Sequence, residues 1–361
     1  MGGATNRISY RHAVRFLGLS AALLVLLFTA APAAVAAGHV ESRFGPVAGF
    51  PFGEPRNLSL GYPTLLIDVA PGSEDSDVYS WTIDPTDLSA SLLWADYWVV
   101  PGDLEGGILV FPRDGGVWAR DVAHGDVEFP ISLRSAGTKS KSAPQISGTT
   151  VVWQESNAGQ RDIRGATFDP VTHAVTRTFW VAHRATNEKD PRIAGDWVVW
   201  MDGRAGNWDI YGRDLATGTV KAICTNHAKQ DQAWTDGTWV VWRDWRNESS
   251  AGADIYGRRL TATSHVRAIC RARRMQEEPR VAGGFAVWTD WRHDPHYGPG
   301  LHDTDVYGWD AVSRSVFLVA GGPLMEHGAE TANGVVMYLR HTEEFRDMPA
   351  EGSVLGASLA H

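Results

Sequence analysis

The sequence predicts an all-β protein built from a repeated unit of four antiparallel strands. Two short phrases, Val-Val-Trp and Asp-Ile-Tyr-Gly, recur in the same order along the chain. They are rich in β-branched and aromatic residues, which favour strands, and clusters of glycine, aspartate and asparagine bound them. No unit shows a sustained 3.6-residue apolar periodicity, so long helices are not expected.

The beginning of the chain has the pattern of a secretory signal peptide. A basic segment with three arginines is followed by an apolar stretch over residues 17–31 and by the small-x-small cleavage pattern Ala34-Val35-Ala36. The apolar stretch is short for a membrane span, which needs about 20 residues, although an uncleaved anchor is the alternative. We therefore predict a signal peptide over residues 1–37, no membrane span after its removal, and a secreted, periplasmic or cell-surface protein.

The charge of the chain argues against two classes of partner. The formal net charge is -9, and removing the three arginines of the predicted signal peptide makes it about -12. An acidic protein lacks the basic surface that nucleic acids require. The same charge opposes electrostatic docking on anionic lipid. We therefore expect no nucleic-acid partner and no electrostatic binding to membranes.

The four strands of the unit follow one another in its clearest copy, which covers residues 190–218 and the segment after it. The first is a short Pro-x-Ile-x-Gly segment, the second carries Val-Val-Trp, the third carries Asp-Ile-Tyr-Gly, and the fourth is a run such as Val220–Cys224. A glycine precedes the second strand, where a tight hairpin needs a positive φ. This glycine is found at Gly148, Gly195, Gly237 and Gly283.

A tryptophan recurs at one position of the second strand. It is present at Trp153, Trp200, Trp242 and Trp288. Because tryptophan brings a large apolar area, we expect these rings to fill the space between neighbouring sheets. Cys224 and Cys270 end equivalent fourth strands of neighbouring units. Such strands lie too far apart for a disulfide, so we expect both cysteines to be free and buried.

The spacing of the repeat predicts a β-propeller. The aligned apolar residue of the second strand falls at positions 66, 110, 152, 199, 241, 287 and 336. Four antiparallel strands in every unit of about 40 to 50 residues are typical of propeller blades. Seven copies favour seven blades over residues 57–361, after a lead-in at 38–56. The last copy lacks a fourth strand, and we expect residues 55–59 to supply it and close the ring.

The order Pro-x-Ile-x-Gly, Val-Val-Trp, Asp-x-Arg-x-Gly-x-x-Asp-Ile-Tyr resembles the TolB-like propeller repeats of bacterial and archaeal secreted and surface proteins. The resemblance is best over residues 190–218. It implies a bacterial protein that serves as a protein-binding platform, as a polysaccharide-active enzyme or as a module beside a hydrolase domain. Six blades are common in that group, so six remains the alternative to seven.

Three Asp-x-Arg loops lie between the second and third strands. They contain Asp202 and Arg204, Asp244 and Arg246, and Asp290 and Arg292. One interpretation is that their carboxylates hold Ca²⁺, another divalent cation or a substrate. The other is that each arginine pairs with the aspartate of its own hairpin and fixes the turn. Recurrence in several blades favours the second interpretation, because a site is usually made once.

Tryptophans in the same loops are candidate ligand-binding residues. Trp208, Trp245 and Trp291 could stack on sugar rings or anchor a protein partner, together with Arg246 and Arg292. The alternative is that each ring covers the arginine of its own loop through a cation–π contact.

The longest loop is a candidate metal site. It contains His293, His296, His302 and Asp303, and imidazole together with carboxylate suits Zn²⁺ or a similar ion. The spacing matches no established metal motif, so a solvated loop is the alternative.

The function predicted from these features is binding without catalysis. We expect a secreted propeller that binds an extracellular polysaccharide or an envelope protein through one loop face. No nucleophile elbow, phosphate loop, dinucleotide fingerprint or His-Glu-x-x-His motif is present, so no catalytic residue is assigned. The alternative is a carbohydrate-active lyase or hydrolase, which a cluster of histidines, arginines and acids over the central channel would favour. A structural module of a cell-envelope assembly is a third interpretation.

Overall fold

The computed structural model of the protein describes residues 39–44, 54–61, 64–70, 77–83, 90–97, 102–134, 140–248, 252–261, 263–294, 303–342 and 351–361. The signal peptide predicted for residues 1–37 lies outside these ranges and stays a prediction. Within them, no helix has the length and apolar character that crossing a bilayer requires.

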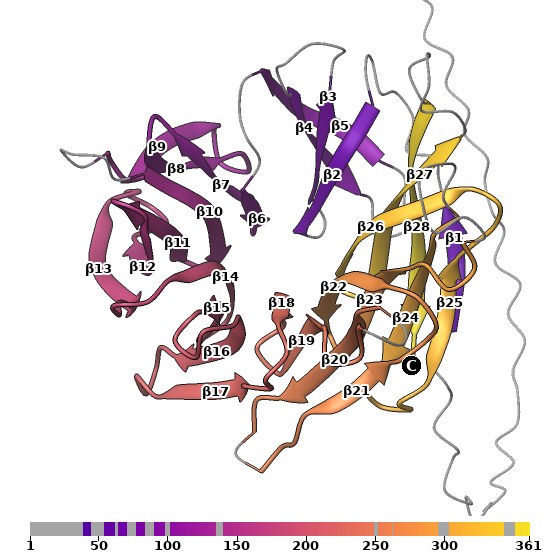
Figure 1. The fold of residues 1–361 in the computed structure, drawn as a ribbon. Coiled ribbons are helices and arrows are strands. Elements are labelled where there is room, and N and C mark those ends of the chain that lie inside the picture. Colours follow the sequence, from indigo (N-terminus) through magenta and orange to yellow (C-terminus); the bar gives the residue numbers. More distant parts are fainter. Residues whose placement is uncertain are drawn as a thin grey trace, which may run out of the picture. The chain divides into compact units, whose positions relative to one another are not determined.

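The described residues form seven four-stranded antiparallel sheets, which confirms the predicted all-β class and the seven units (Figure 1). The first described strand of the chain is β1 (His39–Phe44). The first sheet in chain order contains β2 (Glu54–Gly61), β3 (Thr64–Ala70), β4 (Asp77–Ile83) and β5 (Ala90–Tyr97). The second sheet contains β6 (Asp103–Glu105), β7 (Ile108–Arg113), β8 (Gly116–Asp121) and β9 (Val127–Ser132). The third contains β10 (Ser140–Ser147), β11 (Thr150–Asn157), β12 (Gln160–Phe168) and β13 (Val175–Ala182).

The fourth to seventh sheets continue the same pattern. The fourth contains β14 (Glu188–Ala194), β15 (Trp197–Asp202), β16 (Asp209–Asp214) and β17 (Val220–Cys224). The fifth contains β18 (Gln230–Thr235), β19 (Trp239–Asp244), β20 (Asp254–Arg259) and β21 (Arg267–Cys270). The sixth is β22 (Gln276–Ala282), β23 (Phe285–Asp290), β24 (Asp305–Asp310) and β25 (Val316–Ala320), and the seventh contains β26 (Met325–Ala332), β27 (Val335–Thr342) and β28 (Glu351–Ala360).

The strand that completes the seventh sheet differs from the predicted one. β1 pairs antiparallel with β28, so a strand from the predicted lead-in is the fourth strand of that sheet. Residues 55–59 lie instead in β2, which pairs with β3. Only two residues separate β2 from β3, so this hairpin closes a very short loop at little cost in chain entropy. The expectation that residues 55–59 close the ring was therefore wrong.

The recurring tryptophans lie between sheets, as predicted. Trp153, Trp200, Trp242 and Trp288 are the largest fully buried side chains of the described residues. Trp242 of β19 packs in one apolar cluster with Met201 and Ile210 of the preceding sheet. The glycines before the second strands have φ values between 55° and 80°, which confirms that these turns need glycine.

The glycines that end the third-strand phrase at Gly257 and Gly308 have a different role, because each leaves room for a side chain of the fourth strand. A Cβ atom added to Gly308 would lie 2.7 Å from Phe317 Cζ, and these two residues are paired across β24 and β25. We expect Gly308→Ala to lower the free energy of unfolding by about 1–3 kcal/mol, the usual cost of overpacking. Urea unfolding monitored by tryptophan fluorescence measures this loss.

Gly322→Ala is the matched control for this prediction. No heavy atom lies within 4 Å of a Cβ added at Gly322, so the substitution is expected to leave the urea midpoint unchanged or slightly raised. Equal midpoints for the two variants would contradict the steric role of Gly308.

Candidate ligand-binding site

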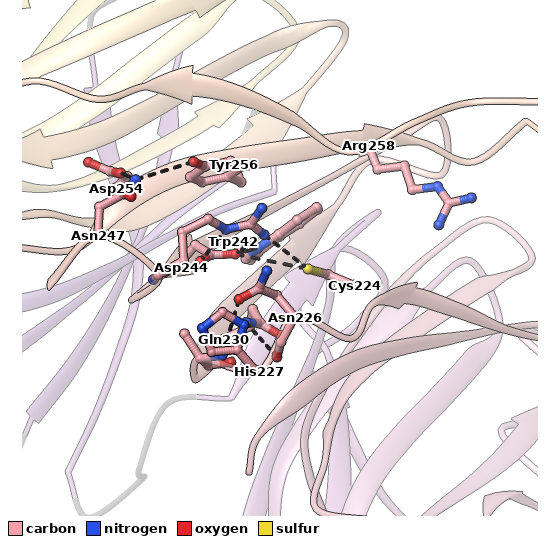
Figure 2. A network of polar contacts seen from close by, with 12 residues as sticks. Cys224, Asn226, His227, Gln230, Trp242, Asp244, Asn247, Asp254, Tyr256 and Arg258 are labelled. Carbon is pink, nitrogen blue, oxygen red and sulfur yellow. Dashed lines mark hydrogen bonds and ion pairs between the residues drawn. The ribbon is translucent and has the colours of Figure 1, made fainter. Parts of the chain in front are cut away.

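The Asp-x-Arg loops form closed polar sets within their own hairpins. The fully buried Asp244 carboxylate accepts hydrogen bonds from Arg246 Nε (2.8 Å) and Nη2 (2.7 Å). It also accepts one from Trp242 Nε1 (2.9 Å), which lies beside it in Figure 2. Asp202 and Asp290 make the same contacts with the arginine two residues later and the tryptophan two residues earlier. The interpretation that each arginine pairs with the aspartate of its own hairpin is therefore confirmed.

A tyrosine of the third strand lies next to each of these guanidinium groups. The Cζ atoms of Arg204, Arg246 and Arg292 lie 3.7, 4.1 and 3.7 Å from the ring centroids of Tyr211, Tyr256 and Tyr307, respectively. The expectation that the loop tryptophans cover these arginines was therefore wrong. The tyrosines take this position because each is paired directly across from the second-strand tryptophan. A ligand could bind Arg246 or Arg292 fully only by displacing these contacts.

The two thiols adjoin two of the polar sets. Arg246 Nη2 lies 3.4 Å from Cys224 Sγ, and Arg292 Nη2 lies 3.3 Å from Cys270 Sγ. Both cysteines are free and buried, as predicted. Burial, and then the charge of Asp290, raise the pKa of Cys270 to about 12, so this thiol is protonated and unreactive at neutral pH.

Two of the loop tryptophans are hydrogen-bonded to carboxylates of first strands. Trp245 Nε1 donates to Asp231 Oδ1 (3.2 Å), and Trp291 Nε1 donates to Glu277 Oε1 (2.8 Å). Arg243 joins the two carboxylates, because its Nε lies 2.7 Å from Asp231 Oδ1 and its Nη1 lies 2.8 Å from Glu277 Oε2. Both indole rings are half-buried. They are thus fixed in place, and ligand binding by Trp245 and Trp291 stays a prediction.

Trp208 takes the place of the missing loop tryptophan in the β14–β17 sheet. Gly203 stands in that sheet where Trp245 and Trp291 stand in the next two. A Cβ atom added to Gly203 would lie 3.5 Å from Trp208 Cζ3, so the Trp208 ring covers this position. Lys189 Nζ lies 4.7 Å from the centroid of the Trp208 ring. This sheet therefore presents a lysine and an indole at a position where its neighbours present a carboxylate and an indole.

The predicted metal site is described only in part, because His296 and His302 lie outside the described residues. His293 Nδ1 lies 2.7 Å from Asp305 Oδ2. Burial, followed by the charge of Asp305, raises the pKa of Asp303. Among the residues that the structure describes, no group of three or more histidine, cysteine, aspartate or glutamate side chains has a metal-binding arrangement. The metal site stays a prediction.

The first strands of five sheets carry a bulge at one shared position, which the sequence did not reveal. The bulge residue has a φ between 49° and 60° and is Ala143, Asp190, Gln232, Glu278 or Gly328. A bulge changes the direction of the side chains that follow it. Two positions later, each strand carries a residue whose partner on the second strand is the aligned residue or, for Glu330, the next residue, Met337. These residues are Gln145, Arg192, Trp234, Arg280 and Glu330, and Asp103 of β6 has the same register.

We call these six side chains the waist residues, and the cationic ones gather around Trp234. The Cζ atoms of Arg192 and Arg280 lie 4.7 and 4.1 Å from the centroid of the Trp234 ring. Arg280 Nε also lies 2.6 Å from Glu330 Oε1. Arg192 Nε is buried and has no hydrogen-bond partner among the described residues. Arg192 is therefore a donor with unused capacity in the interior of the protein.

Burial dominates the electrostatics of the waist residues. It lowers the pKa of Arg192, and the nearby charge of Arg280 lowers it further. Burial raises the pKa of Asp103 and of Glu330, against the opposing charges of Arg192 and Arg280. An added opposite charge or hydrogen bond would stabilise the charged form of each of these groups, because burial removes the water that would otherwise solvate it.

Two cavities meet at the waist residues. The first, which we call the mouth cavity, has a volume of about 290 Å³ and lies at the beginning of the first strands, next to Trp208. The second has a volume of about 360 Å³ and lies at the ends of the same strands. Arg192 and Trp234 line both cavities. They therefore separate the mouth cavity, which opens among the Asp-x-Arg loops, from the second cavity, which opens among the turns between first and second strands.

The mouth cavity has an unusual combination of side chains for an acidic protein. Its lining contains two indole rings, four cationic side chains and three carboxylates. They are Trp208 and Trp234, then Lys189, Arg192, Lys229 and Arg280, then Asp190, Asp231 and Glu278. Its charged groups thus carry one excess positive charge, whereas the chain carries -9.

A signal for the waist residues was present in the sequence. They occupy the first variable position of Pro-x-Ile-x-Gly or the equivalent position of the weaker copies, where polar, charged and aromatic residues replace one another from copy to copy. A single copy gives no reason to expect function there, because a strand bordering solvent also alternates. Only the alignment of all copies, together with the bulge, shows that these side chains come together.

Comparison with solved structures supports the β-propeller fold. The propeller domain of the Trilobed protease from Pyrococcus furiosus is similar to this chain with a TM-score of 0.58 and 12% identity, over 84% of this chain and 93% of that one. Acylaminoacyl peptidase from Pyrococcus horikoshii is similar with a TM-score of 0.58 and 12% identity, over 86% of this chain and 52% of that one. The chain thus spans about half the length of that peptidase. At these identities the likeness shows the fold alone.

A putative TolB from Agrobacterium tumefaciens has 17% identity and a TM-score of 0.44, over 68% of this chain and 88% of that one. A TM-score of this size carries no assignment, so the TolB-like resemblance stays a prediction. No protein-family model and no curated protein matches the sequence.

Proposed function

We propose that the protein is a secreted binding protein that takes a polysaccharide bearing carboxylate groups into the mouth cavity. The observation that carries this proposal is the convergence of Trp208, Trp234 and four cationic side chains on one cavity. Guanidinium groups bind planar carboxylates through paired hydrogen bonds. Indole rings bring apolar surface with a polar edge, which suits the mixed surface of a sugar. A uronic acid unit presents both features in one ring.

Arg192 is the residue that we expect to hold the carboxylate. Its Nε has no partner among the described residues, whereas Arg280 is already paired with Glu330. The guanidinium group lies deep in the protein but borders both cavities. A carboxylate bound to this guanidinium group would replace the stabilisation by water that the group loses on burial.

The shape of the site favours a sugar over a protein partner. A volume of about 290 Å³ is close to the lower end of small-ligand cavities, which begin at roughly 300 Å³. Anchors for protein partners are usually large aromatic side chains at the centre of a contact surface. Here the loop tryptophans are half-buried and bound to groups of the protein itself.

The test is calorimetric titration of the purified protein with oligogalacturonate, and with a neutral glucan oligomer as the comparison ligand. We expect the uronate to bind and the glucan not to bind. Arg192→Gln is expected to weaken uronate binding at least about tenfold, which corresponds to about 1.4 kcal/mol. Arg161→Gln, the same substitution at an exposed position, is the control and is expected to bind as the unmodified protein does.

Three outcomes separate this proposal from its alternatives. Equal binding of neutral and acidic oligomers, or unchanged binding by Arg192→Gln, would contradict it. Arginines and acids do converge on the first strands, as the enzyme alternative expects, so release of unsaturated uronate product during the titration would establish a lyase. Failure of every oligosaccharide, with specific capture of an envelope protein that Arg192→Gln abolishes, would move the ligand class to protein.

A further inference from the structure

A second cationic groove lies between the fifth and sixth sheets, at the other end of the strands from the mouth cavity. We call it the seam groove. It has a volume of about 370 Å³, and its lining includes Trp239, Arg259, Ser264, His265, Arg267 and Arg314. β18 begins beside the mouth cavity and ends at the turn that leads into Trp239. The two sites are therefore separate, and their ligands would bind independently.

The lining of the seam groove contains three arginines and no carboxylate. None of the three forms an ion pair with a described carboxylate, whereas Arg204, Arg243 and Arg280 elsewhere in the chain all do. Clustered like charges repel one another. The groove is therefore a local concentration of positive charge in a chain whose net charge is -9.

Two further cations adjoin the groove and strengthen its positive potential. Lys221 Nζ donates to the Thr261 carbonyl oxygen (2.8 Å), and Arg258 Nε donates to Ser264 Oγ (3.3 Å). Burial, and then the charge of Arg258, lower the pKa of Lys221. Both contacts connect cations to the loop that forms one wall of the groove.

The carboxylates of the adjoining turns are directed toward their own backbone. Asp236 Oδ1 accepts hydrogen bonds from the amides of Thr238 (2.9 Å) and Trp239 (2.7 Å). Asp310 Oδ1 accepts one from the Val312 amide (2.8 Å) and lies 2.9 Å from His361 Nδ1. Neither is among the residues that line the groove, so the arginines face it without a counter-charge.

Parts of the groove are fixed before any ligand arrives. Arg267 Cζ lies 5.8 Å from the centroid of the Trp239 ring, and Trp239 packs edge-on against Trp309 at a centroid distance of 5.1 Å. The Ser264 hydroxyl donates to the Thr261 carbonyl oxygen (3.0 Å) and is held by Arg258. A site with its donors already in place loses less conformational entropy on binding.

From this arrangement we infer that the seam groove binds a phosphate group. Three guanidinium groups supply charge-assisted donors in the fork geometry that oxyanions accept. Thr263 adds a hydroxyl group, and His265 adds an imidazole. The phosphate could be free or could be the ester of a larger molecule, since both present the same oxygens. The acidic charge of the whole chain disfavours an extended anionic membrane surface, so we assign a discrete phosphate.

The probe for the first test is inorganic pyrophosphate, titrated calorimetrically into the purified protein at low salt. We expect binding that Arg314→Gln weakens at least about fivefold and that Arg259→Gln weakens similarly. Both arginines are exposed, so these variants are expected to fold, and their thermal midpoints check this. Arg161→Gln is again the matched control and should bind pyrophosphate as the unmodified protein does.

The pyrophosphate titration tests the phosphate site independently of the result of the uronate titration at the mouth cavity. Absence of pyrophosphate binding, or equal affinity in Arg314→Gln and the unmodified protein, would overturn it. Equal binding of chloride at matched ionic strength would show a general charge effect and would also overturn it. Sedimentation with phosphatidylglycerol vesicles that depends on Arg314, without pyrophosphate binding, would replace the discrete phosphate by a lipid surface. Arg192→Gln should leave pyrophosphate binding intact.

Discussion

Replacing Asp290 by alanine is expected to lower the free energy of unfolding by about 3–5 kcal/mol, which is the typical cost of removing one partner from a buried ion pair. The carboxylate is fully buried and accepts hydrogen bonds from Trp288 Nε1 (2.9 Å) and from Arg292 Nε and Nη2 (2.9 and 2.6 Å). Its loss leaves the buried indole N–H without an acceptor and Arg292 without its counter-charge. Urea unfolding at neutral pH measures the change.

Asp196→Ala and Asp290→Asn are the comparison variants for this prediction. Asp196 is exposed, so its substitution is expected to change stability by less than about 0.5 kcal/mol. Asp290→Asn keeps an acceptor and the shape of the side chain, and it should cost less than Asp290→Ala. Equal losses in Asp196→Ala and Asp290→Ala would show that the buried set does not stabilise the hairpin.

Thiol labelling gives a second readout of the Asp290 set. Burial comes first and the charge of Asp290 second among the causes that raise the pKa of Cys270 to about 12. Asp290→Ala removes that charge and loosens the surroundings of the thiol, so Cys270 is expected to react faster with a thiol reagent. Faster labelling of Cys270, with Cys224 unchanged, would locate the effect in the β22–β25 sheet.

Replacing Glu188 by glutamine is expected to raise stability by about 2 kcal/mol at pH 8. Burial, then the charges of Asp202 and Asp162, raise the pKa of Glu188 to about 7. The unfolded chain has the ordinary glutamate pKa of about 4.3. The folded state therefore loses stability as the pH rises from about 4.3 to about 7, because ionisation is easier in the unfolded chain.

The sixth sheet shows how glutamine fits at this position. Glu188 is paired with Asp202 across β14 and β15, and Gln276 is paired with Asp290 in the same way. Gln276 Nε2 donates to the Arg274 carbonyl oxygen at 2.9 Å. A neutral amide thus places a donor where Glu188 places a charge beside another carboxylate.

The pH dependence distinguishes this explanation from a general packing effect. Unfolding of the unmodified protein and of Glu188→Gln is measured at pH 4 and pH 8. The gain is expected at pH 8 and should be much smaller at pH 4, where Glu188 is protonated in the folded state and mostly protonated in the unfolded chain. The same substitution at exposed Glu248 is the control. A gain of equal size at both pH values would exclude the ionisation of Glu188 as its cause.

Features that depend on residues close together in the chain were predictable from the amino-acid sequence. The strand order within the first six sheets follows from the alternation of apolar phrases and turn residues. The pairing of Asp244 with Arg246 joins residues two positions apart, so one hairpin suffices to form it. The packing of Trp242 was also predictable, because a large apolar ring at a repeated position must be buried.

Features that depend on residues far apart in the chain became visible in the folded structure alone. β1 and β28 meet from opposite ends of the chain, and the local sequence of His39–Phe44 carries no signal for that partner. Arg192 and Arg280 are separated by two repeats, yet both contact Trp234. The repeat therefore fixes the sheets through local contacts, whereas the candidate site exists only because successive sheets place equivalent residues side by side.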